Sequence, residues 1–141
     1  MKNIRLLVSL SFVASFALGC AGSTPLLTSP DVTAIPGTWN LVSIQPAGEA
    51  EQVKPSGASY TVTFADGRLS TRVDCNSCAG PYTVDGQKLV AGPSLACTRA
   101  ACATMAFENA YTKLLGGEST VALSDGALVL TSPRGVLRFM R

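Results

Sequence analysis

Apolar and polar residues alternate in several short stretches from Trp39 to the end of the chain. The clearest stretch is 60–64, where Tyr60, Val62 and Phe64 are separated by threonines. Strict alternation is typical of a strand with one buried face, because successive side chains of a strand point to opposite sides of the sheet. The same pattern predicts further strands at residues 39–44, 68–73, 82–84, 88–90, 120–123, 127–130 and 136–140.

Aspartate-glycine pairs separate neighbouring strands at three places, which are residues 66–67, 85–86 and 125–126. The favoured two-residue hairpin turns require positive φ, and Asp and Gly tolerate it. Each pair therefore predicts a tight turn between antiparallel strands. Residues 133–135, Pro-Arg-Gly, predict a further turn before the last strand.

The spacing of apolar residues becomes helical between residues 100 and 115, where they recur three or four positions apart. These residues are Phe107, Tyr111, Leu114 and Leu115. The stretch is also rich in alanine, and two glycines at 116–117 provide a stop signal. We therefore predict a small α+β domain, in which one helix packs on a curved antiparallel sheet of seven or eight hairpin-connected strands.

The first 19 residues have the features of a secretory signal peptide. Lys2 and Arg5 precede an apolar run at residues 6–18, and small residues follow it. The run is shorter than the roughly 20 apolar residues that a transmembrane helix requires. We therefore expect the protein to be exported and residues 1–19 to be removed.

Residues 17–20 read Ala-Leu-Gly-Cys and resemble the lipobox of bacterial lipoproteins, although Leu18 stands one place nearer the cysteine than is usual. The resemblance implies that Cys20 is lipidated and anchors the protein in a membrane. Ordinary signal-peptidase cleavage near the same position is the alternative. Since alanine rather than aspartate follows the cysteine, the resemblance also implies the outer membrane. Residues 20–36, which are rich in Pro, Ser and Thr, are expected to form a tether.

Composition excludes several classes of function for the mature chain. Without Lys2 and Arg5, nine basic residues balance nine acidic ones, so no positive field attracts nucleic acid. The chain has no histidine, which removes the commonest general base and metal ligand near neutral pH. No nucleophile motif of the Gly-x-Ser-x-Gly type occurs. We therefore expect no catalytic residue, bound metal or cofactor. We also expect the protein to be a monomer.

Five cysteines occur in the chain, and an odd number in an exported protein needs an explanation. Lipidation of one leaves two doublets, Cys75 with Cys78 and Cys97 with Cys102. A zinc site with four sulfur ligands is one interpretation, but disulfides rather than zinc-thiolate sites are typical of oxidising compartments. A redox-active Cys-x-x-Cys is another, but that motif needs a helix after its first cysteine, and Gly-Pro follows here.

Two structural disulfides are therefore the favoured interpretation. A turn at residues 85–86 would bring Cys75 and Cys78 close to residues 94–97. A bond between Cys75 and Cys78 would close a ring too small to stabilise much, so cross-links between the doublets are favoured. The spacing alone leaves open which cysteine of one doublet pairs with which of the other.

Four polar residues near the cysteines are candidates for a site. Asp74 and Glu108 are a conceivable carboxylate pair, but we interpret them as a solvated strand-end acid and a helix-surface acid. Asn76 can bond backbone groups of the disulfide loop, and Arg99 can reach carbonyls or a carboxylate such as that of Asp74. Both are assigned structural roles, with contact to a ligand as the second interpretation.

Several motifs together resemble the META domain of HslJ-like bacterial envelope lipoproteins. They are Gly-Thr-Trp-x-Leu at 37–41, Tyr-x-Val-x-Phe-x-Asp-Gly at 60–67, Cys-Asn at 75–76 with Gly-x-Tyr at 80–82, and Leu-Ala-Cys-Thr-Arg-x-x-Cys at 95–102. The helix with Glu108, Tyr111 and Leu114 and the closing hairpin at residues 128–139 also fit. The resemblance covers residues 37–141, which we assign as the domain.

The resemblance implies a disulfide pairing and a broad function. In family members with a single cysteine pair, that pair corresponds to Cys75 and Cys102. The resemblance therefore implies that Cys78 pairs with Cys97. The family is linked to heat shock, envelope stress and drug tolerance, without an agreed ligand. We therefore expect a non-enzymatic lipoprotein, with its domain in the periplasm, that binds an envelope component. The alternative is a module that binds a small ligand or acts as an inhibitor, with the concave face of the sheet as its pocket.

Overall fold

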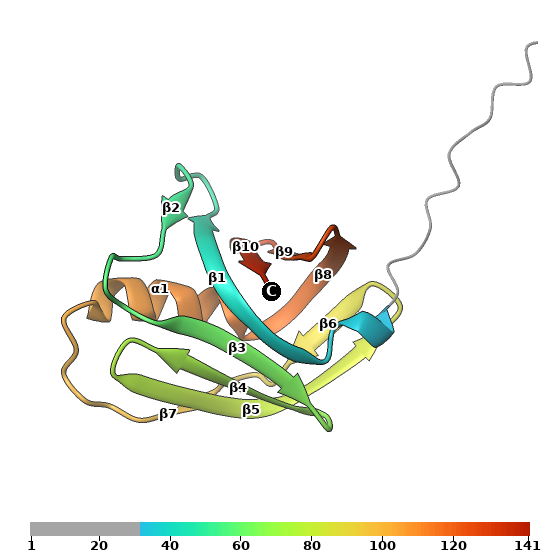
Figure 1. The fold of residues 1–141 in the computed structure, drawn as a ribbon, viewed down its shortest axis with the longest axis horizontal. Coiled ribbons are helices and arrows are strands. Elements are labelled where there is room, and N and C mark those ends of the chain that lie inside the picture. Colours follow the sequence, from blue (N-terminus) through green and yellow to red (C-terminus); the bar gives the residue numbers. More distant parts are fainter. Residues whose placement is uncertain (1–31) are drawn as a thin grey trace, which may run out of the picture.

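The computed structural model describes residues 32–141, so the signal peptide, Cys20 and most of the expected tether lie outside the described residues. The described part contains a short 3-10 helix, ten strands and one α-helix (Figure 1). In chain order these are η1 (Val32–Ala34), β1 (Gly37–Pro46), β2 (Gln52–Val53), β3 (Tyr60–Ala65), β4 (Arg68–Val73), β5 (Asn76–Asp85), β6 (Lys88–Ala91), β7 (Ala96–Cys97), α1 (Met105–Leu115), β8 (Gly117–Ser124), β9 (Ala127–Ser132) and β10 (Gly135–Met140).

Eight of the strands form a closed antiparallel barrel. Their order is β10-β9-β8-β6-β5-β4-β3-β1, and β1 pairs with β10 to close the circle. The two-residue strand β2 pairs with β1 beyond the stretch that pairs with β3, and the two-residue strand β7 pairs with β5 beyond the stretch that pairs with β6. The predicted antiparallel sheet, its strand number and its single helix are confirmed. Closure of the sheet could not be predicted from the sequence. The β1–β10 pairing joins opposite ends of the domain, so no pattern of neighbouring residues in the sequence indicates it.

The ten-residue strand β1 is the element that closes the barrel. Its first four residues pair with β3, and the stretch from Asn40 to Pro46 pairs with β10. The register with β10 shifts between Leu41 and Ser43. An extra residue in one strand bends that strand and increases its twist. The bend allows β1 to pair with β3 at its start and with β10 along the rest of its length.

Side chains fill the interior of the barrel. The largest fully buried ones are aromatic, and helix α1 contributes Tyr111 to them while it packs against β1 and β10. The ring of Tyr111 lies 5.5 Å from that of Tyr60 and 6.3 Å from that of Phe139, both edge to face. The indole of Trp39 donates a hydrogen bond to the carbonyl of Ile35 at 2.8 Å. The concave face of the sheet is therefore the core of the protein, and not the ligand pocket considered above.

Two of the predicted hairpin turns have the expected form. Asp66-Gly67 and Asp125-Gly126 are the central residues of their turns, and all four have positive φ. The third turn differs, because Asp85 still pairs with Lys88 and the central residues are 86–87. There only the glycine has positive φ.

The structure corrects three predicted boundaries. The folded part includes residues 32–36 of the expected tether, because Ile35 is only 1% exposed in the core. Strand β5 begins at Asn76 rather than at residue 82, since pairing with β4 continues through Pro81. Helix α1 begins at Met105 rather than at residue 100, because bonds to the start of β5 hold residues 98–102 outside the helix.

Candidate functional site

Two disulfides connect the start of β5 to the chain that runs through β7 towards α1. Cys75 is bonded to Cys102 and Cys78 to Cys97, with Cα atoms 5.7 Å and 4.0 Å apart. These are the pairs that the family resemblance implies. Cys78 and Cys97 also face each other as partners in the short β5–β7 ladder. No group of His, Cys, Asp and Glu side chains that could hold a metal ion occurs within residues 32–141.

Asn76 is the centre of a hydrogen-bond network beneath these disulfides. Its side chain is 2% exposed, and its oxygen accepts bonds from the Thr98 hydroxyl (2.9 Å) and the Ala100 N–H (2.8 Å). Its amide nitrogen donates to the Ala100 carbonyl at 3.0 Å and also lies 3.1 Å from the Cys102 sulfur. The amide therefore has a structural role, in which it holds the segment before α1 in an extended conformation.

Glu108 is buried, which corrects the interpretation of this residue as a helix-surface acid. Its side chain is 5% exposed, and both carboxylate oxygens lie near the Asn76 amide nitrogen, at 3.1 Å and 3.2 Å. A side-chain amide carries two hydrogens, and one of them points to the Ala100 carbonyl. The two carboxylate oxygens of Glu108 therefore share one donor hydrogen, and the amide group that provides it is uncharged. No described cation forms an ion pair with it.

Asp74 belongs to a separate arrangement at the start of α1 and does not pair with Glu108. Its carboxylate accepts bonds from the N–H of Thr104 at 3.1 Å and from the hydroxyl at 2.6 Å. The same hydroxyl contacts the Tyr60 hydroxyl at 2.8 Å. Burial raises the pKa of Tyr60 above its ordinary value, so the phenol remains protonated near neutral pH. An acid beside the first helical N–H groups stabilises the helix terminus.

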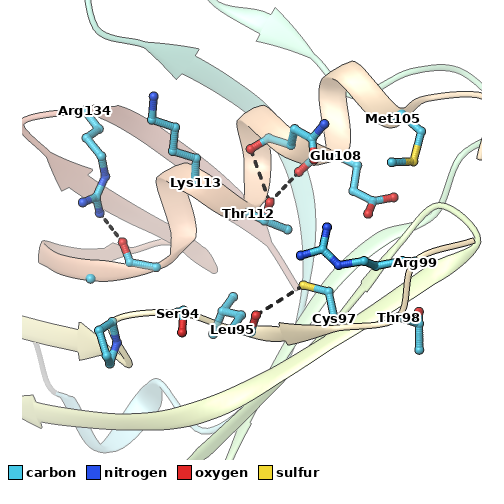
Figure 2. Close-up of a pocket in the computed structure, with 14 residues that line it drawn as sticks. Ser94, Leu95, Cys97, Thr98, Arg99, Met105, Glu108, Thr112, Lys113 and Arg134 are labelled. Carbon is cyan, nitrogen blue, oxygen red and sulfur yellow. Dashed lines mark hydrogen bonds between the residues drawn. The ribbon is translucent and has the colours of Figure 1, made fainter.

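A cleft of about 490 Å³ lies between α1 and the segment from Pro93 to Arg99 (Figure 2). Figure 2 shows Glu108 and Thr112 on the helix side and Leu95, Cys97 and Arg99 on the strand side. The helix contributes one stripe of residues from successive turns, because positions three and four apart share a face. This stripe consists of Met105, Glu108, Asn109, Thr112, Lys113 and Gly116.

Close contact between β5 and the chain after β6 positions the strand side of the cleft. A Cβ atom added to Gly80 would lie 2.9 Å from the Leu95 side chain, so glycine at this position allows Leu95 to lie directly on β5. The Cys78–Cys97 disulfide fixes the same segment two residues later. The strand side of the cleft is therefore held in place by packing and by a covalent bond.

Positive side chains predominate in the lining of the cleft. Arg99, Lys113 and Arg134 line it together with one acid, Glu108. The Arg134 guanidinium donates to the Gly116 carbonyl, so it completes the end of α1. Arg99 and Lys113 are exposed and form no hydrogen bond or ion pair with any described residue. The two cations are available to an anionic ligand.

Sequence reasoning identified Arg99 but not its neighbours. Arg99 does not contact Asp74, whose carboxylate is bonded to Thr104. Lys113 has the sequence signal of a cation in the last turn of a helix, where it complements the helix dipole. Arg134 lies in the turn between β9 and β10, and no sequence signal connects that turn with α1. The cleft arises only where these three separate segments meet.

Comparison with known proteins identifies a family and a fold. A family model described as META domain matches residues 32–141. No curated protein matches the chain. An NMR structure of a protein from Burkholderia xenovorans is 24% identical, with a TM-score of 0.65, and the match covers 86% of this chain and 95% of that one. A second NMR structure is 22% identical, with a TM-score of 0.58, over 75% of this chain and 89% of the other. At these identities the structures show a shared fold alone.

Within the described residues, no helix is long and apolar enough to cross a membrane.

Proposed function

Because this chain belongs to the META-domain family, we propose that it is a non-enzymatic binding protein of the bacterial cell envelope. It is anchored to the outer membrane by lipid at Cys20, and its domain binds an anionic envelope component from the periplasm. This binding supports envelope integrity under stress. The signal-like residues 1–19 and the lipobox-like residues 17–20 support the location. Two disulfides support it as well, since such bonds persist in oxidising compartments.

The main support for the binding function is that two cations in the cleft, Arg99 and Lys113, have no ion-pair partner among the described residues. A surface cation without a partner is common, but Arg99 and Lys113 lie in the lining of one concave site. Concave sites whose charges have one sign attract ligands of the opposite sign. The cleft, at about 490 Å³, is also large enough to take up one group of a larger ligand, because sites of about 300–1,000 Å³ hold small molecules and cofactors.

A small-ligand or inhibitor module is the second candidate function. The volume of the cleft favours it, because about 490 Å³ is sufficient for one small molecule. Its site is then the cleft beside α1 rather than the concave face of the sheet, which the core fills. Native mass spectrometry of the exported protein distinguishes the two functions. A small molecule that the wild-type protein retains, and that the variant Arg99→Glu/Lys113→Glu does not, supports this second function.

Complementation of a deletion strain tests the binding function. The variant Arg99→Glu/Lys113→Glu reverses both free charges of the cleft. The matched control, Arg68→Glu/Arg72→Glu, makes the same change in charge at two exposed arginines of β4 outside the cleft lining. Growth is measured in the presence of detergent and of an antibiotic that the outer membrane normally excludes.

We expect the wild-type protein and the β4 control to restore growth, and the cleft variant to fail at equal abundance and equal melting temperature. Full restoration by the cleft variant would refute the proposed site. Cys20→Ser tests the anchor separately: we expect this variant to leave the membrane fraction and to lose metabolic labelling with a fatty acid. A Cys20→Ser protein that is still labelled would contradict lipidation at this residue.

A further inference from the structure

We propose that the occupant of the cleft is an extended segment of an acidic polypeptide, which adds to the outer edge of β7 as a further strand. This inference rests on the proposed binding function and specifies the chemical class of the partner. The main chain of the partner bonds to the edge of β7. Its carboxylates lie opposite Arg99 and Lys113.

Strand β7 has one paired edge and one edge that faces the cleft. Among the strands of residues 32–141 it pairs only with β5, through Cys78–Cys97 and Ala79–Ala96. The next residue, Thr98, donates its N–H to the Ser77 carbonyl at 2.9 Å. Residues of an antiparallel pair alternate between hydrogen-bonded and non-bonded positions, so the backbone N–H and carbonyl of Cys97 point away from β5. The Cys78–Cys97 Cα separation of 4.0 Å is consistent with a non-bonded position.

An outward-facing pair of backbone groups on a strand edge is a template for another strand. Peptides that add to such an edge gain affinity from main-chain hydrogen bonds and specificity from pockets for alternate side chains. The outward-facing position recurs at every second residue, that is at Leu95, Cys97 and Arg99. An extended peptide beside this edge also directs the backbone N–H and carbonyl groups of every second residue toward it, so the two sets of groups match. Leu95 and Arg99 both line the cleft on either side of Cys97.

Helix α1 sets the length of chain that the cleft accepts. The stripe that lines the cleft runs from Met105 to Gly116, which covers the whole 11-residue helix. At about 1.5 Å per residue, the helix is roughly 16 Å long. A strand rises about 3.3 Å per residue, so roughly five residues of an extended peptide lie alongside the helix.

The charges of the cleft favour acidic side chains in that peptide. Arg99 lies on the strand side, and Lys113 lies on the helix side near its C-terminal end. Beside the other short edge strand, β2, an acid and a cation already lie close together. Next to it, the Glu51 carboxylate is bonded to Ser43 and lies 3.5 Å from Arg138. At β7, by contrast, the outer strand edge occurs together with two free cations that line one cleft.

A peptide array tests the inference with the Cys20→Ser protein, which retains the whole exported chain without the lipid. The array carries octapeptides of alternating β-branched residues and glutamates, with the glutamate positions varied. Duplicate arrays replace every glutamate with glutamine or with lysine. The member that binds best is then titrated into the protein and monitored by NMR. Two N-methylated versions of it block either the odd or the even backbone N–H groups.

We expect glutamate peptides to bind at least about tenfold more tightly than their glutamine counterparts, which corresponds to a difference of about 1.4 kcal/mol in binding free energy. Arg99→Glu/Lys113→Glu should weaken binding by at least about tenfold, whereas Arg68→Glu/Arg72→Glu should change it less than about twofold. One N-methylated version should lose binding and the other retain it, because only alternate N–H groups face the edge. Amide exchange at Cys97 should slow in the complex.

The inference is overturned if no glutamate peptide exceeds its glutamine counterpart, if both N-methylated versions bind like the parent, or if inorganic phosphate displaces the peptide at a similar concentration. In those cases the proposed function still stands as long as the cleft variant fails to restore growth. If the cleft variant restores growth fully but peptides bind, the binding function in the envelope fails and the peptide site remains.

Discussion

Replacement of Asn76 by alanine is expected to destabilise the domain more than any other polar-to-alanine change near the disulfides. The substitution removes one amide that bonds residues 98 and 100 and the carboxylate of Glu108. Ala100 and Thr98 are exposed, so water replaces the lost partners there. Glu108 is only 5% exposed, so water replaces the lost donor there much less readily.

The size of the effect follows from this difference in exposure. Each ordinary hydrogen bond contributes about 0.5–1.5 kcal/mol, and water partly replaces the three bonds to the exposed segment, so together they account for roughly 1.5–2 kcal/mol at the lower end of that range. A bond to a charged group contributes about 1.5–3 kcal/mol, and its loss leaves the Glu108 carboxylate buried without a donor. We therefore expect a loss of about 3–5 kcal/mol. For a domain of this size, that lowers the melting temperature by roughly 12–20 °C.

Urea unfolding, followed by circular dichroism in the absence of reductant, measures the loss. Asn109→Ala is the matched control, because Asn109 is exposed on α1, and we expect a change within about 0.5 kcal/mol. Glu108→Gln removes the charge without removing the side chain. If the buried carboxylate causes the loss, Asn76→Ala should cost at least about 1 kcal/mol less in the Glu108→Gln protein than in the wild type.

Two outcomes would refute this reasoning. A loss below about 1 kcal/mol for Asn76→Ala would mean that water or a neighbouring cation replaces the amide. The second outcome is that Asn76→Ala lowers the free energy of unfolding equally in the wild type and in the Glu108→Gln protein. The carboxylate would then not be the group left without a donor.

Further predictions concern barrel closure, pH and the disulfides. Gly135→Ala should prevent folding or cost at least about 3 kcal/mol, because its Cβ would collide with the carbonyl of Gln45 on β1; Gly126→Ala, with no atom within 4 Å, should cost only about 1–2 kcal/mol for its positive φ. Thermal unfolding compares the two, and equal losses would contradict the closure argument. Burial raises the pKa of Tyr111 above its usual 10.0, so the folded state retains the proton that the unfolded chain loses. Stability should therefore be constant below about pH 10 and decline above it by roughly 1 kcal/mol per pH unit, and urea unfolding at pH 8–11 should show a smaller decline for Tyr111→Phe. Joint replacement of Cys78 and Cys97 by alanine should cost about 2–4 kcal/mol, and an unchanged urea midpoint would show that the cross-link does not restrict the unfolded chain.

Local patterns were sufficient to predict most of the elements. The alternation at residues 60–64 and the turn at residues 66–67 depend on neighbours within a few positions, and the structure has the predicted hairpin there. Helix α1 was predicted too long at its start, because alanine-rich composition favours a helix at residues 100–104. Distant contacts with Asn76 and with Cys75 override that preference.

The candidate site could be predicted only in part, because it depends on exposure and on proximity. The sequence indicated Asn76 and Arg99, since both stand beside cysteines. It could not show that the amide is buried and the guanidinium free. The same applies to Glu108, whose position on a helix suggested solvent exposure, whereas the structure buries it beside Asn76 of β5.

The sequence by itself determined the family, the strands, the helix and the turns, because each depends on side chains close together in the chain. It also predicted export and an anchor at Cys20. The tertiary structure decided that the sheet closes through β1 and β10, that its concave face is the core, and that Arg99, Lys113 and Arg134 meet in one cleft. These features join segments separated by many residues, and their positions follow from how the whole barrel packs.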